Sequence, residues 1–102
     1  MANQITGSIN VSTAGTAVRV TTRTDRVIRA YFKPNENNSG ACIYVGDSTV
    51  SSTNGMSRSD QTTWGGAFEY YPVSVSADEF YVDVDTNNDD VDYLLVLGAG
   101  RQ

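Results

Sequence analysis

Residues 80–97 alternate between two kinds of side chain, and this pattern constrains the fold more than any other part of the chain. The apolar and polar positions of 80–85 are Phe80, Val82 and Val84 against Tyr81, Asp83 and Asp85. Such alternation is typical of a strand with one buried face. Thr86 to Asp90 predict a hairpin turn, because Asn and Asp tolerate positive φ and bond their own backbone.

A second strand is predicted at 91–97, and it is apolar on both faces. The positions that continue inward are Val91, Tyr93, Leu95 and Leu97. Leu94 and Val96 make the opposite face apolar as well. A strand of this kind is either central in its sheet or covered by a partner chain. Leu94 and Val96 are therefore candidate contact residues.

The remaining strands follow from shorter patterns. Alternation predicts strands at 17–23 and 26–33, with Ile28, Ala30 and Phe32 inward and Arg29, Tyr31 and Lys33 outward. We expect the second of these to end at Pro34 and to neighbour a strand at 42–45, as a hairpin or alongside it. Residues 46–66 predict a long corner with one short strand, which Trp64 could pin to the core. Pieces at 68–71 and 73–75, separated by Pro72, predict an edge strand.

The chain of 102 residues is long enough for one thin core,. No stretch of ten or more residues shows helical periodicity. We predict an all-β fold: one antiparallel β-sandwich or jelly roll of six to eight short strands over 1–102, with 1–11 as a flexible or partner-bound arm.

Histidine is absent and Cys42 is the only cysteine. The absence of histidine removes the commonest general base and transition-metal ligand. A single cysteine excludes an internal disulfide, and we interpret Cys42 as a buried, inert thiol. Paired acids such as Asp78 and Glu79 could serve a glycosidase, but neighbours on one strand indicate a charged outer face. We predict a protein that is not an enzyme and needs no cofactor.

Charges are separated along the sequence. Five of the seven basic residues fall within 19–33 and seven of the twelve acids within 78–92. This predicts a domain with one basic and one acidic side. Those sides are either solvated strand faces or an assembly surface that orients a partner. The candidate partner-binding residues are Arg19, Arg23, Arg26, Arg29, Trp64, Tyr70, Tyr71, Leu94 and Val96.

Two other partners are not expected. The net charge of -5 and a pI near 4.3 oppose nucleic-acid binding,. No apolar run approaches the ~20 residues of a membrane span, and MANQITG lacks the features of a secretory signal. We expect a chain made in the cytoplasm and not exported.

The acidic loop resembles the start of a calcium site. Its oxygen ligands would be Asp85, Asn87, Asp89 and Asp90. An EF-hand requires Gly at the sixth position and Glu at the twelfth, where this chain has Asn88 and Leu94,. The loop therefore favours a turn, with a nonstandard calcium site as the alternative.

Two segments carry a resemblance to a known group. IYVGDSTVSSTNG at 43–55 and FYVDVDTNNDDVDY at 80–93, preceded by STAGTAV at 12–18, resemble small β-sandwich structural proteins of tailed bacteriophages. The chain departs from that group at SRSDQTTWGGAFEYYP. The resemblance implies a virion component at the capsid surface, either a capsid cement (decoration) protein or a head or tail accessory protein. It would bind the major capsid protein and copies of itself, as a dimer or trimer.

A sugar-binding or surface-binding module is the alternative function. Exposed Trp and Tyr on a β-sandwich can stack on saccharide rings. Trp64, Tyr70 and Tyr71 would form that platform.

Overall fold

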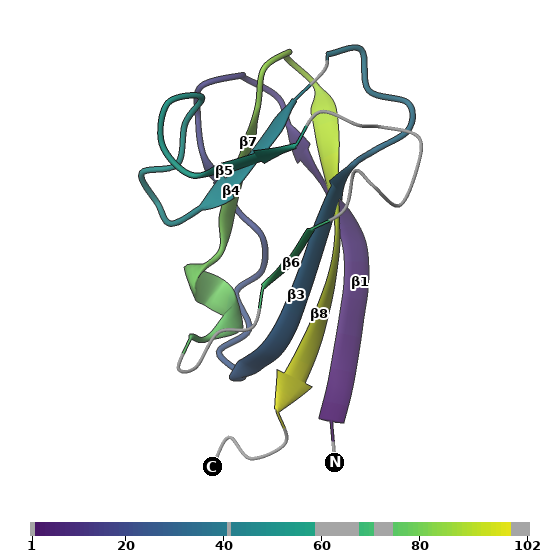
Figure 1. The fold of residues 1–102 in the computed structure, drawn as a ribbon, viewed down its shortest axis with the longest axis vertical. Helices are drawn as coiled ribbons and strands as arrows, with labels where there is room; N and C mark the ends of the chain where they lie inside the picture. The colour runs from purple at the N-terminus through teal and green to yellow at the C-terminus, as the bar shows by residue number, and fades with distance from the viewer. Residues whose placement is uncertain (1, 41, 59–67, 71–74, 99–102) are drawn as a thin grey trace.

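The computed structural model describes residues 2–40, 42–58, 68–70 and 75–98, with the backbone alone at 2, 3, 57, 58 and 68–70. A short 3-10 helix, η2 (Ala77–Glu79), precedes the seventh strand. The strands are β1 (Ala2–Val11), β2 (Val18–Arg19), β3 (Val27–Pro34), β4 (Ile43–Gly46), β5 (Met56–Arg58), β6 (Phe68–Tyr70), β7 (Tyr81–Val84) and β8 (Asp89–Gly98) (Figure 1).

The strands form two four-stranded antiparallel sheets that pack against each other. Sheet A has the order β1-β8-β3-β6, and sheet B has the order β2-β7-β4-β5. The long strands β1, β3 and β8 lie side by side, and the short strands of sheet B cover one end of them (Figure 1). The all-β prediction is confirmed, and the described residues contain eight strands, within the predicted range.

The hydrophobic core lies between the two sheets, where the apolar positions of the alternating strands meet. Phe32 of β3 and Phe80, just before β7, meet with their ring centroids 5.5 Å apart and their planes tilted by 46°. Such tilted pairs add to the stabilisation from area burial alone. The fully or almost fully buried members are Val11, Val20, Val27, Ala30, Phe32, Ile43, Val45, Ala77, Phe80, Val82, Val84, Val91, Leu95 and Leu97.

Two predicted strand pairings are wrong. β7 and β8 do not form a hairpin, because β7 lies in sheet B and β8 in sheet A. Likewise β3 and β4 belong to different sheets, so 35–40 crosses between the sheets. The apolar faces of these strands therefore meet across the core. Alternation indicates which face of a strand is buried but not which strand lies beside it.

The two similar segments of the sequence are instead neighbours in sheet B. IYVG of β4 pairs antiparallel with YVDV of β7, with Tyr44 opposite Asp83 and Val45 opposite Val82. The turn between β7 and β8 contains Asn88 at φ 70, as expected for an Asn in a turn,. The turn was predicted at 86–90, but β8 begins at Asp89, so the last two of these residues belong to the strand, and the turn connects two sheets.

The N-terminal segment is not an arm in this structure. Ala2–Val11 forms β1 and pairs with β8 along its whole length. Within the described residues, β1 pairs with β8 alone and is an edge strand of sheet A. Gly7 is needed there because the Tyr93 ring lies over it, and a Cβ atom at this position would approach the Tyr93 hydroxyl to 2.9 Å.

A bulge in β3 overturns one prediction of the buried face. The pairing with β8 shifts between Val27 and Arg29, so that Val27 is buried while Ile28 is 39% exposed. A bulge places two residues opposite one and thereby reverses the side chains that follow. Beyond it, Ala30 and Phe32 are buried as predicted.

The remaining segments agree with the predictions where they are described. β2 is shorter than the predicted 17–23, but Val20 is buried while Arg19 is exposed. β5 is the one short strand expected in the corner, and β6 lies at the edge of sheet A. Trp64 and Tyr71 lie outside the described residues.

Asp83 was predicted to point outward but is buried, with 1% of its surface exposed. The 12–17 turn lies against this position, and Gly15, at φ 93, donates its N–H to Asp83 Oδ1 at 2.9 Å. The Val84 N–H donates to the same oxygen at 2.8 Å. The carboxylate therefore fastens the turn to sheet B.

Replacing Asp83 measures how much these two hydrogen bonds contribute to the free energy of unfolding. Asp83→Ala leaves the N–H groups of Gly15 and Val84 without their acceptor and should lower the free energy of unfolding by about 1–3 kcal/mol. Asp83→Asn keeps an oxygen acceptor and should lose less. Urea denaturation measures both.

The control is Glu36→Ala, at an exposed position, which should change stability by less than about 0.5 kcal/mol,. Equal stability of Asp83→Ala and the wild type would show that the carboxylate does not hold the turn.

Candidate functional site

The outer face of sheet A brings together residues that the sequence separates. Opposite residues in antiparallel strands share a face. Val96 therefore lies between Gln4 and Arg29, and Leu94 lies between Thr6 and Tyr31. We call this surface the sheet A face and define it by Arg26, Ile28, Arg29, Tyr31, Lys33, Leu94 and Val96.

The bulge in β3 adds Ile28 and Arg26 to this surface. Gly98 follows Leu94 and Val96 on the outward side of β8. A Cβ atom on Gly98 would lie 3.3 Å from the Arg26 guanidinium and 3.4 Å from Ile28. Both side chains therefore cover the end of the outer face. Ile28 is one of two large exposed hydrophobic residues found in the described part of the chain.

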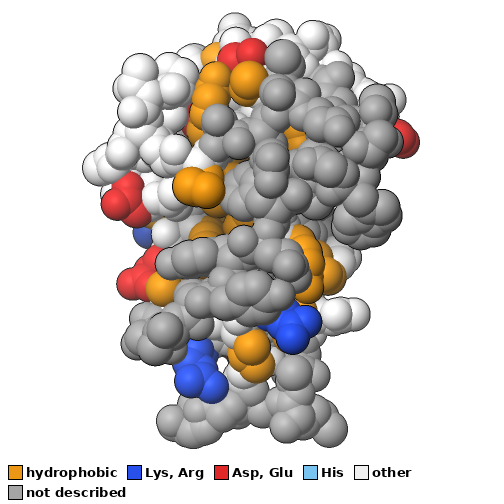
Figure 2. Space-filling view, viewed as in Figure 1, with side chains coloured by type: hydrophobic (Ala, Val, Ile, Leu, Met, Phe, Trp, Pro, Cys, Tyr) orange, Lys and Arg blue, Asp and Glu red, His pale blue; other side chains and the backbone are white. Residues whose placement is uncertain are grey.

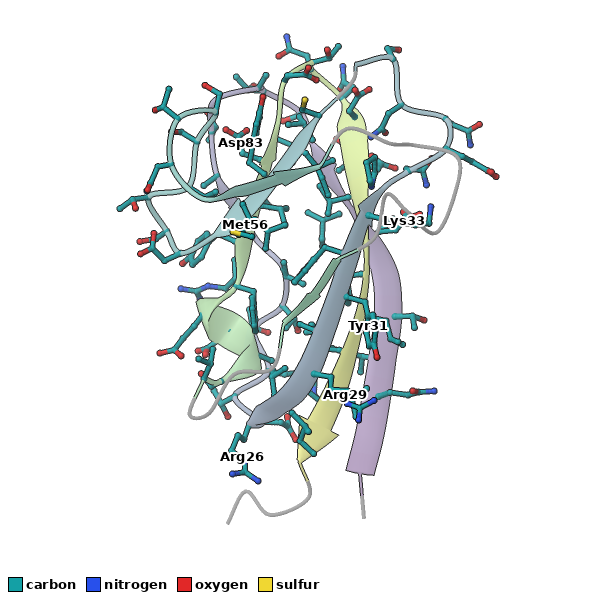
Figure 3. The ribbon with its side chains drawn as sticks, viewed as in Figure 1. Arg26, Arg29, Tyr31, Lys33, Met56 and Asp83 are labelled. Atoms are coloured by element: carbon teal, nitrogen blue, oxygen red, sulfur yellow. The ribbon has the colours of Figure 1, made fainter. Side chains whose placement is uncertain are left out.

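Basic groups border the apolar centre of the sheet A face. Figure 3 shows Arg29, Tyr31 and Lys33 following one another on one side of β3, with Arg26 at its lower end. Figure 2 shows basic side chains beside hydrophobic ones at that same end of the molecule. Leu94, Val96 and Tyr31 are half-buried, while Arg29 is exposed.

The other end of the face is polar and internally satisfied. Asp92 accepts hydrogen bonds from Ser8 Oγ at 2.6 Å and Asn35 Nδ2 at 3.0 Å, and it pairs with Lys33 at 3.2 Å. Burial acts to raise the pKa of Asp92, but these hydrogen bonds and the Lys33 charge outweigh it, so the pKa lies below its ordinary value,. This network ties β1, β3 and β8 together.

The predicted basic residues do not share one face. Arg19 lies on sheet B, where its guanidinium donates to the Tyr81 hydroxyl at 2.7 Å and lies 5.3 Å from the ring centroid. Arg23 lies in the loop before β3 and pairs with Asp25 at 2.9 Å. Of the five basic residues within 19–33, Arg26, Arg29 and Lys33 belong to the sheet A face. The prediction that these basic residues form one side of the domain is therefore wrong.

The aromatic candidates are placed only in part. Tyr70 lies opposite Ala30 in the β6–β3 register, and its side chain is not described. Trp64 and Tyr71 lie outside the described residues. Among the described side chains, Tyr31 is the aromatic one on the sheet A face, and it was not among the predicted partner-binding residues. The outward alternation of 26–33 was the signal that could have found it.

Most side chains of the acidic loop accept hydrogen bonds from neighbouring segments of the chain. Asp89, 4% exposed, accepts the N–H groups of Ser39 and Gly40 at 2.9 and 2.7 Å. Asn87 accepts from Ala14 N at 2.8 Å, and Asp90 accepts from Asn10 Nδ2 at 2.7 Å. Asp85 lies exposed at the start of the same turn.

These contacts support the turn interpretation of the acidic loop. In the described ranges, no group of three or more Asp, Glu, Cys or His side chains is placed to hold a metal ion. The oxygens of Asp89 and Asn87 that would face a calcium ion accept N–H groups instead. The geometry of this loop is that of a hydrogen-bonded corner.

Cys42 is half-buried on the outer side of sheet B. Burial raises the pKa of the neighbouring Tyr44 phenol, and the charges and hydrogen bonding of Cys42, together with Asp85 and Asp83, raise it further. The Tyr44 phenol therefore favours its neutral form.

A hollow lies between the β4–β5 corner and the start of β7. Phe80, Val45 and Val50 contribute to its apolar floor, and Asp47 and Glu79 contribute to its rim. The Arg19–Tyr81 pair also lines it. A concave apolar site with a few polar groups is the general form of a small-ligand pocket.

Comparison of the chain with protein-family models, with curated proteins and with solved structures finds no match. Among the described residues, no helix is long and apolar enough to cross a lipid bilayer.

Acid should weaken the Asp92 network. The folded pKa of Asp92 is depressed below the ordinary 3.8, so its stabilisation is present above that value and is lost as the pH falls through the folded pKa,. Asp92→Asn removes this titration. The difference in unfolding free energy between wild type and Asp92→Asn should therefore shrink as the pH falls from about 6 to about 2.

Denaturant unfolding at several pH values measures this difference, with Glu36→Gln as the matched change at an exposed turn acid. A difference that stays constant across the pH range would contradict the role of Asp92.

Proposed function

We propose that this protein is a non-enzymatic structural component of a tailed-phage particle, a cement protein that binds the capsid surface through the sheet A face. Two arguments support the proposal. The segments 43–55 and 80–93 resemble small structural proteins of that group, and the all-β two-sheet fold suits such a role. The observation that carries the binding surface is the exposure of Ile28 beside Arg26 and Arg29.

The chemistry of the sheet A face defines the partner surface. Apolar side chains of the partner would cover its centre, which consists of Ile28, Tyr31, Leu94 and Val96. Such apolar contacts set the lifetime of a complex. Arg26 and Arg29 border that centre and would meet carboxylates. Charges at the rim mainly orient the partner and speed its association. We therefore expect an acidic capsid surface with an apolar patch.

Capsids that lack this protein provide the direct test. Added protein should co-sediment with expanded capsids at a fixed copy ratio and raise their disruption temperature. If it neither sediments with capsids nor alters that temperature, the cement function is wrong. Binding to isolated heads but not to tails would also separate a head protein from a tail accessory protein.

Two matched pairs of variants locate the surface. Arg29→Glu should slow association with capsids about tenfold at low salt, and the effect should shrink at high salt, because salt screens exposed charges. Arg19→Glu makes the same charge change on sheet B and should have little effect. Surface plasmon resonance on immobilised capsids measures both rates.

The apolar contact is tested in the same assay. Ile28→Ser should raise the dissociation rate, while Met56→Ser should not. Met56 is 64% exposed and borders the hollow between the β4–β5 corner and β7. Equal effects of the two serine variants would show that the sheet A face is not the binding surface.

Carbohydrate binding is a second candidate, favoured by the hollow that Arg19, Tyr81 and Glu79 border. Aromatic and acidic groups at one rim suit a sugar, which stacks on rings and donates hydroxyls to carboxylates. Titration of the purified chain with bacterial surface glycans should then give binding that Tyr81→Ala abolishes. Unchanged binding in that variant, or none in the wild type, would exclude the hollow as a glycan site.

A further inference from the structure

The free edge of β1 is unusual among edge strands. β1 spans ten residues, ~33 Å of strand, and in the described part of the chain it pairs with β8 only,. Its sequence, ANQITGSINV, contains no charged residue and no proline. Natural edge strands are usually protected from further pairing by lysines, prolines, bulges or a short length. None of these protections is present in β1.

The side chains of β1 also leave apolar surface to be covered. Ile5 and Ile9 point to the inner face of sheet A and are only partly buried against the core. Between them lies Gly7, whose inner side is occupied by the Tyr93 ring. A further strand beside β1 would cover both isoleucines and satisfy the open backbone groups.

The sequence of β1 complements itself. We propose that β1 pairs antiparallel with β1 of a second copy, about a two-fold axis through Gly7. In this register Ile5 lies opposite Ile9 of the second copy on the inner face, and Thr6 lies opposite Ser8 on the outer face. Gln4 then lies opposite Asn10, so these three pairs join residues of the same character, while Asn3 lies opposite Val11.

Symmetry permits this register and disfavours its neighbours. A two-fold axis perpendicular to the sheet keeps inner residues opposite inner residues, so the register can change only in steps of two. The register centred on Thr6 places Ile5 opposite Gly7 and leaves Ile9 opposite Asn3. The register centred on Ser8 places Ile9 opposite Gly7 and Ile5 opposite Val11. Both therefore lose the isoleucine pairs. The Gly7-centred contact is isologous and closes as a dimer instead of extending into a fibre.

Oligomeric state in solution is the first test. Sedimentation velocity of the wild type should give a species of twice 11.0 kDa. Thr6→Lys places two lysines beside the axis, where their charges repel, and should weaken the dimer at least tenfold without changing the monomer's circular dichroism. Thr22→Lys, the same change at an exposed loop threonine, should remain dimeric.

Cysteine cross-linking tests the register. In a Cys42→Ser background, Thr6→Cys combined with Ser8→Cys should form a disulfide-linked dimer under mild oxidation, because these positions are directly opposite. Neither Thr6→Cys nor Ser8→Cys alone should do so. Efficient linkage of either single variant would indicate the register centred on that residue and overturn the proposed one.

The proposal does not depend on the capsid function. A monomeric wild type, or a Thr6→Lys variant as dimeric as the wild type, would overturn it. So would a dimer that dissociates in Ile28→Ser but not in Thr6→Lys, because that dimer would use the sheet A face. Capsid binding by a protein that is always monomeric would leave the proposed function standing while rejecting the β1 pairing.

Discussion

The central position of β8 in sheet A is the constraint on which the rest of the structure depends. β8 pairs with β1 on one side and with β3 on the other. Its inner side chains, Val91, Leu95 and Leu97, are completely buried between the two sheets. A strand paired on both edges and buried on one face has a fixed register, because a slip of one residue would expose that apolar row. The same register determines which side chains of β8 lie on the outer face of sheet A.

Carboxylates supply the hydrogen-bond acceptors that the apolar core lacks. Most connections in this fold cross between the sheets, and their backbone N–H groups need acceptors near the core. Asp83 holds the 12–17 turn, and Asp89 holds Ser39 and Gly40 in the crossing from β3 to β4. Buried carboxylates accept several N–H groups at once and form strong hydrogen bonds.

The use of acids inside the fold changes the meaning of the net charge. The value of -5 counts Asp83 and Asp89, which are buried, and Asp92, which pairs with Lys33. Three of the seven acids within 78–92 are therefore buried or paired and contribute less to the surface charge than the sequence implies. The surface that a partner would meet includes Arg26 and Arg29 beside apolar side chains.

Sequence patterns predicted the faces of strands better than their neighbours. The inner rows of β7 and β8 were correct because alternation is a local property of each strand. The pairing of β4 with β7 was missed, since pairing depends on how the connections cross the core. Ile28 was misplaced because a bulge leaves no clear signal in the sequence. The candidate site was found in part: Arg26, Arg29, Leu94 and Val96 are on one surface, whereas Arg19 and Arg23 are not.

The β1 edge and the sheet A face belong to one sheet, and this has a consequence for binding. A two-fold axis perpendicular to sheet A carries the outer face of one copy onto the same side as the outer face of the other. The proposed dimer would therefore present two copies of Ile28, Arg26 and Arg29 to one partner surface. Two linked contacts bind more tightly than either alone when the partner carries repeated sites at a matching spacing. In the proposed function the capsid lattice is a repeated surface of this kind, and the dimer would bind it through two sheet A faces at once.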